Sequence, residues 1–184
     1  MTIDVEKCHI THYPAQVLGK ASQPVEKIDD NIRRLVVKMA DLMVELKGVG
    51  FAAPQAGVPL RLFIISLDGS RDNVRVYVNP AVKGEGPLVE NEEGCLSVPG
   101  IFAKIKRYSQ ATVTATDLDG KTFTDKGEGF YARALQHEFD HIEGVTIVNR
   151  MPTVARIAYR KQLKKLEEEN GDAGSCHLYI LKDK

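Results

Sequence analysis

Residues 137–141 read His-Glu-Phe-Asp-His, and this pattern is the strongest sign of chemistry in the chain. Two histidines four positions apart lie about one turn from each other on one face of a helix, so both imidazoles can reach one metal ion. Glu138 follows the first histidine and can take up or release a proton beside that metal. A catalytic site also needs a third protein ligand and one open position. The source of that third ligand therefore decides the function.

The flanking residues favour a metal site over a surface helix with two solvated histidines. The segment Phe130–Gln136 is mostly apolar and contains good helix formers, and Gly144 is a suitable helix C-cap. We therefore expect a largely buried helix over residues 129–143. Buried histidines need partners, and a metal ion with an open position supplies them.

Downstream of the pair, the sequence offers no good third ligand. One group of zinc proteases places a histidine three residues after a glycine that matches Gly144, but this chain has Ile147 there, and its only later histidine is His177. A second protease group uses a downstream glutamate. The run Glu167–Glu169 is available, although three consecutive acids are typical of a solvated helix face. A zinc protease is thus an alternative with a weak ligand set.

Upstream, Cys95 is the best soft ligand. A thiolate with two imidazoles suits zinc or ferrous iron. A free cysteine is more often only a small buried thiol. Beside the histidine pair the metal interpretation is favoured, because Gly94 lets the backbone pass close to a ligand.

Three segments, taken in order, resemble one family, the peptide deformylases: Gly48–Gln55, Glu93–Ser97 and Gln136–His141. Residues Tyr13–Glu26 also resemble the start of that family, so the resemblance covers about residues 10–170. Each motif is moderately specific, and the three in order are highly specific. The family removes the formyl group from the N-terminal methionine of newly made bacterial polypeptides.

The resemblance implies that Cys95, His137 and His141 hold one divalent metal ion. Ferrous iron is the metal that the family implies, and zinc would fit the same ligands. Glu138 would be the general acid and base. From position alone, we also expect Asp140 either to orient a ligand histidine or to pair with an arginine such as Arg107.

The resemblance also implies how the substrate is held. Gln55 and the backbone N–H of Leu96 would form an oxyanion hole, and Gly50 would line the cleft. The methionine side chain needs an apolar pocket, for which Val49, Phe130 and Leu96 are candidates; each could equally be ordinary core.

Departures from the family's commonest pattern are few. Val49, Phe51 and Ile142 replace other apolar residues, which leaves the chemistry intact. The segment Gly100–Phe102 stands where many members carry polar residues, so the resemblance does not determine the detailed shape of the substrate cleft.

Composition indicates one ordinary globular domain. The chain has 184 residues, with a core of about 10–170 and a tail of 171–184, and is 43% hydrophobic and 27% charged. Its formal net charge is zero, which implies no bulk attraction to DNA or to an anionic membrane. Three cysteines make no disulfide framework, no apolar run approaches the length of a membrane span, and no signal pattern begins the chain. We therefore expect a cytoplasmic protein.

Periodicity and turn signals predict an α+β fold, with mixed or antiparallel sheets around a central metal-binding helix and with helices toward both ends. Asp29 or Asp30 can cap the first helix, and Gly48 marks its end. Asp119-Gly120 predicts a hairpin. The expected helices cover residues 30–47, 129–143 and 154–170, and the expected strands cover 60–66, 75–79, 112–117 and 121–124.

Two terminal features have weaker interpretations. The last expected helix is basic, which suits contact with ribosomal RNA, although a solvated face is the simpler explanation. Its basic residues are Arg156, Arg160, Lys161, Lys164 and Lys165. At the N-terminus, Cys8, His9 and His12 resemble a small metal cluster, but a strand with exposed histidines is favoured. Residues 176–181 suggest a short strand.

We therefore predict a metal-dependent hydrolase that deformylates N-formylmethionyl peptides and releases formate. The enzyme alternative is a protease. The alternative without catalysis is a ribosome-binding or peptide-binding module with a structural metal, which would need a fourth ligand that none of the three motifs supplies.

Overall fold

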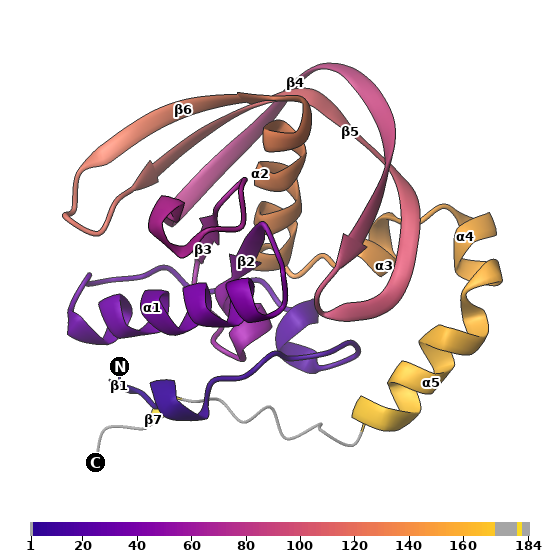
Figure 1. Ribbon diagram of the computed structural model, residues 1–184, viewed down its shortest axis with the longest axis horizontal. Coiled ribbons are helices and arrows are strands. Elements are labelled where there is room, and N and C mark those ends of the chain that lie inside the picture. The colour runs from indigo at the N-terminus through magenta and orange to yellow at the C-terminus, as the bar shows by residue number, and fades with distance from the viewer. Residues whose placement is uncertain (1, 172–179, 182–184) are drawn as a thin grey trace.

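The computed structural model describes residues 2–171 and 180–181, and it shows an antiparallel sheet wrapped around one central helix (Figure 1). The sheet has five strands in the order β2-β3-β4-β5-β6, and β1 pairs separately with β7. The strands are β1 Thr2–Ile3, β2 Gly50–Ala52, β3 Leu62–Ile65, β4 Arg75–Cys95, β5 Val98–Thr116, β6 Thr122–Glu128 and β7 Ile180–Leu181. The helices are α1 Asp30–Glu45, α2 Gly129–Ile142, α3 Ile147–Arg150, α4 Thr153–Ala158 and α5 Arg160–Asn170, with short 3-10 turns η1 Val5–Lys7, η2 Gln16–Gly19, η3 Ala53–Ala56 and η4 Arg71–Asn73.

Helix α1 forms where its apolar periodicity predicts it. The Asp29 side chain caps the helix by accepting hydrogen bonds from the backbone N–H groups of Asn31 and Ile32. At the other end, Lys47 rather than Gly48 takes the left-handed conformation, with φ of 56°. The Gly48 N–H bonds back to the Met43 carbonyl at 2.8 Å, which ends the helix.

Strands β4 and β5 form one long twisted hairpin, which is the largest departure from the sequence-based expectation. The strands predicted at 75–79 and 112–117 are only the far ends of this ribbon. The middle of the ribbon was not predicted, because it is rich in charged residues and glycines. Such residues are tolerated there because much of the ribbon is exposed on at least one face. The ribbon brings Cys95, at its tip, back toward α2. The hairpin predicted at Asp119-Gly120 is confirmed and joins β5 to β6.

Helix α2 packs against the concave side of the sheet, where Leu135 and Ile142 join Phe63, Tyr77 and Val113 in one buried cluster. A second cluster lies between α1 and the start of the sheet, and a third lies between the tip of β5 and helices α3–α5. The helix predicted over 154–170 is divided at Tyr159 into α4 and α5. These observations confirm the α+β class.

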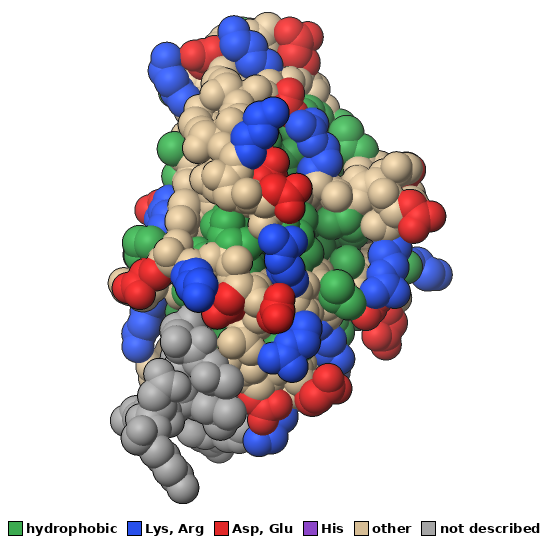
Figure 2. All heavy atoms as spheres, turned by 90° about the vertical axis from the view of Figure 1, so that its left-hand side faces the viewer, with side chains coloured by type: hydrophobic (Ala, Val, Ile, Leu, Met, Phe, Trp, Pro, Cys, Tyr) green, Lys and Arg blue, Asp and Glu red, His purple; other side chains and the backbone are tan. Residues whose placement is uncertain are grey.

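The surface mixes both signs of charge. In the view of Figure 2, Lys and Arg side chains alternate with Asp and Glu in small groups, as the zero net charge predicts. No helix in the described part of the chain combines the length and the apolar character that crossing a bilayer requires. Of the strand suggested at residues 176–181, residues 176–179 lie outside the described part of the chain, and Ile180–Leu181 form β7, in which Ile180 pairs with Ile3.

Candidate metal centre

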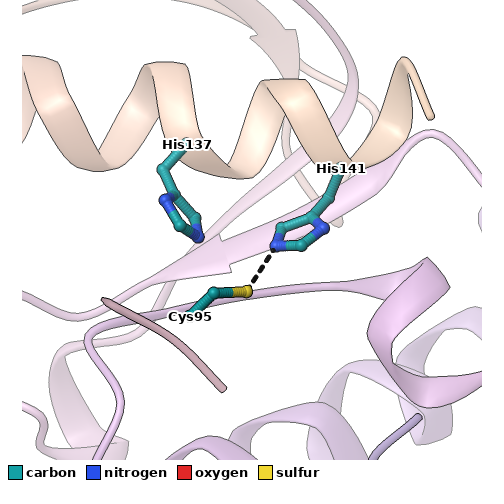
Figure 3. A group of neighbouring side chains, drawn as sticks. All are labelled: Cys95, His137 and His141. Atoms are coloured by element: carbon teal, nitrogen blue, oxygen red, sulfur yellow. Dashed lines mark hydrogen bonds between the residues drawn. The ribbon is translucent and has the colours of Figure 1, made fainter. Parts of the chain in front are cut away.

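One side of α2 and the tip of β4 bring a cysteine and two histidines together. His137 and His141 project from successive turns of α2 toward Cys95, the last residue of β4 (Figure 3). One ligand atom from each of the three lies within 4.8 Å of the others, and Cys95 Sγ is 3.3 Å from His141 Nε2. Among residues 2–171 and 180–181, this is the one group of three such side chains close enough to share an ion. Cys8, His9 and His12 form no such group.

The electrostatics of this group suit a cation. Burial alone raises the pKa of the Cys95 thiol, but the two histidines overcome that effect and hold its pKa well below the usual value. Burial lowers the pKa of His137, whereas the hydrogen bonds that His137 donates to Cys95 and Glu93 outweigh burial and raise it. The cluster thus stabilises a thiolate and positive charge beside it, and a divalent metal ion meets both demands. The donor set of one sulfur and two nitrogens fits such an ion.

Glu138 lies between this cluster and β2. Its side chain is 4% exposed, and burial raises its pKa to about 7. Gly50 explains how the carboxylate fits, because a Cβ at this position would overlap Glu138 Oε1. A larger residue at position 50 would therefore displace the carboxylate from the metal cluster.

Gln55 is held so that its amide nitrogen faces the cluster. Its Oε1 accepts a hydrogen bond from the Ala52 N–H at 2.8 Å, which fixes which end of the amide is oxygen. Its Nε2 then donates to Ser97 Oγ at 3.2 Å and lies 3.8 Å from Cys95 Sγ. Leu96 lies in the turn between Cys95 and β5 and lines the same cavity as Gln55.

A buried carboxylate, Glu93, supports the histidine. It lies 3.1 Å from His137 Nδ1 and accepts two hydrogen bonds from Arg107, at 2.7 and 3.0 Å, and one from Arg133. Because a carboxylate only accepts, His137 donates through Nδ1 and leaves Nε2 free for a metal. Burial opposes ionisation of Glu93, but His137 and Arg107 hold its pKa at about 2.

Asp140 extends the same network on the other side of Arg107. It accepts a hydrogen bond from Arg107 Nη1 at 2.8 Å and another from Arg150 Nε at 3.0 Å. Of the two expected roles for Asp140, pairing with Arg107 is the one observed. Arg150 thereby ties α3 to α2.

The cluster opens onto a cleft of about 640 Å³. Every residue assigned to the site from sequence except His141 lines this cleft, namely Val49, Gly50, Gln55, Cys95, Leu96, Phe130, His137 and Glu138. Phe102 is also in its wall, so the segment Gly100–Phe102 does shape it. Phe130 is 59% exposed, which excludes the alternative of an ordinary core residue.

Sequence reasoning missed four neighbours of the site: Glu93, Ser97, Arg133 and His12. Two of them carried a usable signal. Glu93 is two residues before Cys95 on a strand, and Arg133 is four before His137 on a helix, so each shares a face with a ligand. His12 reaches the cleft through the fold alone, since its neighbours Thr11 and Tyr13 bond to the backbone carbonyls of Gln55 and Ser97.

An α+β domain that gathers a thiolate, two imidazoles and a buried glutamate around an open cleft defines a metal-dependent hydrolase. Residues 7–156 match the family model described as polypeptide deformylase. The chain belongs to the peptide deformylase family.

Individual relatives agree. The chain is 38% identical over 162 residues to a peptide deformylase of Chromobacterium violaceum, covering 88% of this chain and 97% of that protein. It is 38% identical to one of Helicobacter hepaticus, with 88% and 92% covered. Among solved structures, a peptide deformylase from Legionella pneumophila is 39% identical with a TM-score of 0.82, covering 89% and 97% of the two chains. One from Plasmodium falciparum is 32% identical with a TM-score of 0.85, covering 89% and 98%.

The family fixes the reaction. The chain is an enzyme that removes the N-formyl group from the N-terminal formylmethionine of newly made polypeptides and releases formate, and it uses a metal cofactor. Formylated peptides are therefore its substrates. The protease alternative and the alternative without catalysis are both wrong.

Glu93→Gln should destabilise the fold and weaken metal binding together. The amide keeps the size of the side chain but leaves Arg133 without its buried counter-charge and Arg107 with Asp140 alone, a loss that typically costs about 3–5 kcal/mol. Urea denaturation and elemental analysis measure the two effects. The matched control is Glu92→Gln, an exposed neighbour on the same strand. Equal stability and metal content in the two variants would show that the network has no such role.

Proposed function

We propose that deformylation takes place at the cluster of Cys95, His137 and His141, which hold the metal while its open side faces the cleft. The observation that carries this proposal is the convergence of three ligand atoms within 4.8 Å at the wall of a large cleft. Three protein ligands with one open position is the arrangement of a catalytic site, whereas a structural site is closed by a fourth ligand.

Glu138 is the proton carrier in this proposal. A divalent metal bound here supplies Lewis acidity, which lowers the pKa of water and polarises a carbonyl. Glu138 accepts the proton that the attacking water loses and then delivers it to the nitrogen of the departing peptide. Its pKa of about 7 suits both steps at neutral pH, because the carboxyl group exchanges a proton readily in either direction.

Gln55 and Leu96 stabilise the negative charge that develops on the formyl oxygen. The Gln55 amide is already oriented by Ala52, so its N–H needs no rearrangement during the reaction. The backbone N–H of Leu96 is the second donor. Loss of one such donor typically costs about 3–4 kcal/mol of transition-state stabilisation.

The substrate lies extended between two strand edges. β2 is an edge strand of the sheet, and its first residue Gly50 lines the cleft together with residues Glu92–Cys95 of β4. Backbone pairing with such edges holds a peptide without reading its side chains, which suits an enzyme that processes many polypeptides. Gly50 and Val49 contribute from the β2 side, and Phe130 from α2. The first side chain, methionine, enters the apolar part of the cleft.

Ferrous iron is the metal we propose, with zinc as the alternative. A thiolate and two imidazoles accept either ion, so the ligand set alone does not separate them. Elemental analysis of protein purified without oxygen distinguishes them, and a zinc content equal to the protein concentration would contradict the iron assignment.

Removal of the metal should abolish formate release. We expect formyl-Met-Ala-Ser to be hydrolysed, a chelator to stop the reaction, and ferrous iron to restore it. Cys95→Ser should lose both metal and activity, whereas Cys8→Ser, a matched change at a buried cysteine outside the cleft, should keep both. Cleavage of internal peptide bonds by the wild-type enzyme, or full metal content in Cys95→Ser, would contradict the proposal.

Glu138→Gln should separate catalysis from metal binding. The amide has nearly the same shape but cannot carry the proton, so kcat should fall by about 10²–10⁴-fold. Elemental analysis should find the metal content unchanged. A variant that keeps the metal and more than half of the wild-type kcat would remove Glu138 from the mechanism.

We also propose that the enzyme acts in the cytoplasm and contacts the ribosome through α4 and α5. Lys164 and Lys165 lie 3.4 and 3.6 Å from Glu168 and Glu169, so these two of the five basic residues are paired with acids, as on an ordinary solvated helix face. The triple change Arg156→Glu, Arg160→Glu and Lys161→Glu should weaken pelleting with ribosomes, and more so at low salt. The control is the pair Lys164→Glu and Lys165→Glu. Identical pelleting of both variants and the wild type would exclude this contact.

A further inference from the structure

One stripe of α2 forms a wall of the catalytic cleft. Phe130, Arg133, Ala134 and His137 all line it, at the spacing of one helix face. His137 belongs to the metal cluster, Arg133 is one turn away, and the exposed Phe130 lies at the end of the stripe. Residues along the stripe thus lie at increasing distance from the metal cluster, in the order His137, Arg133 and Phe130.

A second, smaller groove of about 250 Å³ lies beyond this stripe, at the N-terminal end of α2. Val89 and Asn91 of β4, Ser109 of β5 and Gly129 line it. Arg133 also lines it, and Arg133 is the residue that the cleft and the groove share. Arg133 thus borders both spaces.

Arg133 is fixed in that position. It is 8% exposed, and its Nη1 donates to Glu93 and to the Ile105 carbonyl at 3.0 Å. Its Nη2 donates to the Val89 carbonyl at 2.9 Å. A guanidinium held by a carboxylate and two backbone carbonyls, from both strands of the hairpin, does not swing aside without breaking buried charged hydrogen bonds.

We propose that Arg133 is a specificity-determining residue, because it closes the end of the side-chain pocket and limits the length of the first residue that the enzyme accepts. The inference rests on the proposed function, in which the first side chain enters the cleft beside His137. Four residues of helix separate Arg133 from His137, a rise of about 6 Å. That span suits an unbranched side chain the size of methionine, and a longer one meets the guanidinium.

The position of the groove determines what a shorter side chain at position 133 would do to the pocket. Space already exists behind Arg133, so shortening this side chain would join groove and cleft instead of leaving a sealed void. The added space would be bordered by Val89, which is 40% exposed, and by the methyl group of Ala134. An apolar side chain that is two atoms longer than methionine would then pack in the space that the Arg133 guanidinium fills in the wild-type protein.

The test compares two substrates on each variant. One is formyl-Met-Ala-Ser, and the other carries 2-aminooctanoic acid, with a linear six-carbon side chain, in place of methionine. The ratio of kcat/KM for the long substrate to kcat/KM for the methionine substrate should rise by about tenfold or more in Arg133→Ala, because methylenes in an apolar pocket change kcat/KM by that order. Loss of metal or of folded enzyme cancels in this ratio, so a merely structural role would not change it.

Arg107→Met is the matched control. Arg107 also bonds to Glu93 and is buried, but it lines neither the cleft nor the groove. Its loss should lower both kcat/KM values and leave their ratio unchanged. If Arg133→Ala does not fold, the same ratio measured on Arg133→Met decides. A ratio in the Arg133 variants equal to that of wild type or of Arg107→Met overturns the inference, whereas no formate from either substrate with the wild-type enzyme contradicts the proposed function itself.

Discussion

The site depends on the pairing of one buried carboxylate, Glu93, with two buried arginines. A lone carboxylate at this depth would be neutral or excluded, because desolvation of a charge is costly. Arg107 from β5 and Arg133 from α2 offset that cost and keep Glu93 ionised. The ionised group then fixes His137 in the tautomer that leaves Nε2 for a metal. Two strands and a helix are therefore held together by the same group that orients His137.

Close packing of backbone imposes a second constraint. Gly50 lies so near Glu138 that a methyl group would overlap the carboxylate, and at Gly94 a Cβ would come within 2.6 Å of the Phe102 ring. The first glycine lets β2 approach the Glu138 carboxylate. The second lets an aromatic ring cover the residue before Cys95. These two glycines of the deformylase motifs are thus explained by the side chains packed against them and not by their own backbone angles.

The sequence predicted the parts of this structure that repeat with a regular period. Helices α1 and α2 were found because their apolar residues recur on one face, and the hairpin at Asp119-Gly120 because its turn chemistry is specific. The long ribbon of β4 and β5 escaped prediction, because Gly84–Pro87 and the acids of 90–93 are typical of loops. Its pairing depends on residues far apart in the chain, which no local pattern encodes.

The site was predicted more fully than the fold, because motifs name residue types directly. The predicted ligands do meet, while their roles and those of Gln55 and Glu138 stay predictions. The support around them was not foreseen: Arg133 is four residues before His137, yet its bonds to Val89 and Ile105 require the ribbon. Sequence spacing therefore indicates which residues share a face, and only the fold indicates what they touch.

The distance along the chain between Cys95 and His141, 46 residues, has a consequence for folding. In an unfolded chain one turn of helix could place the two imidazoles, but the sulfur would be remote from them. A cation that needs all three donors binds almost only the native state, so by mass action it raises the free energy of unfolding by RT ln(1 + [M]/Kd). An ion held by these three side chains would therefore join the ribbon tip to the helix, and its removal would lower the free energy of unfolding.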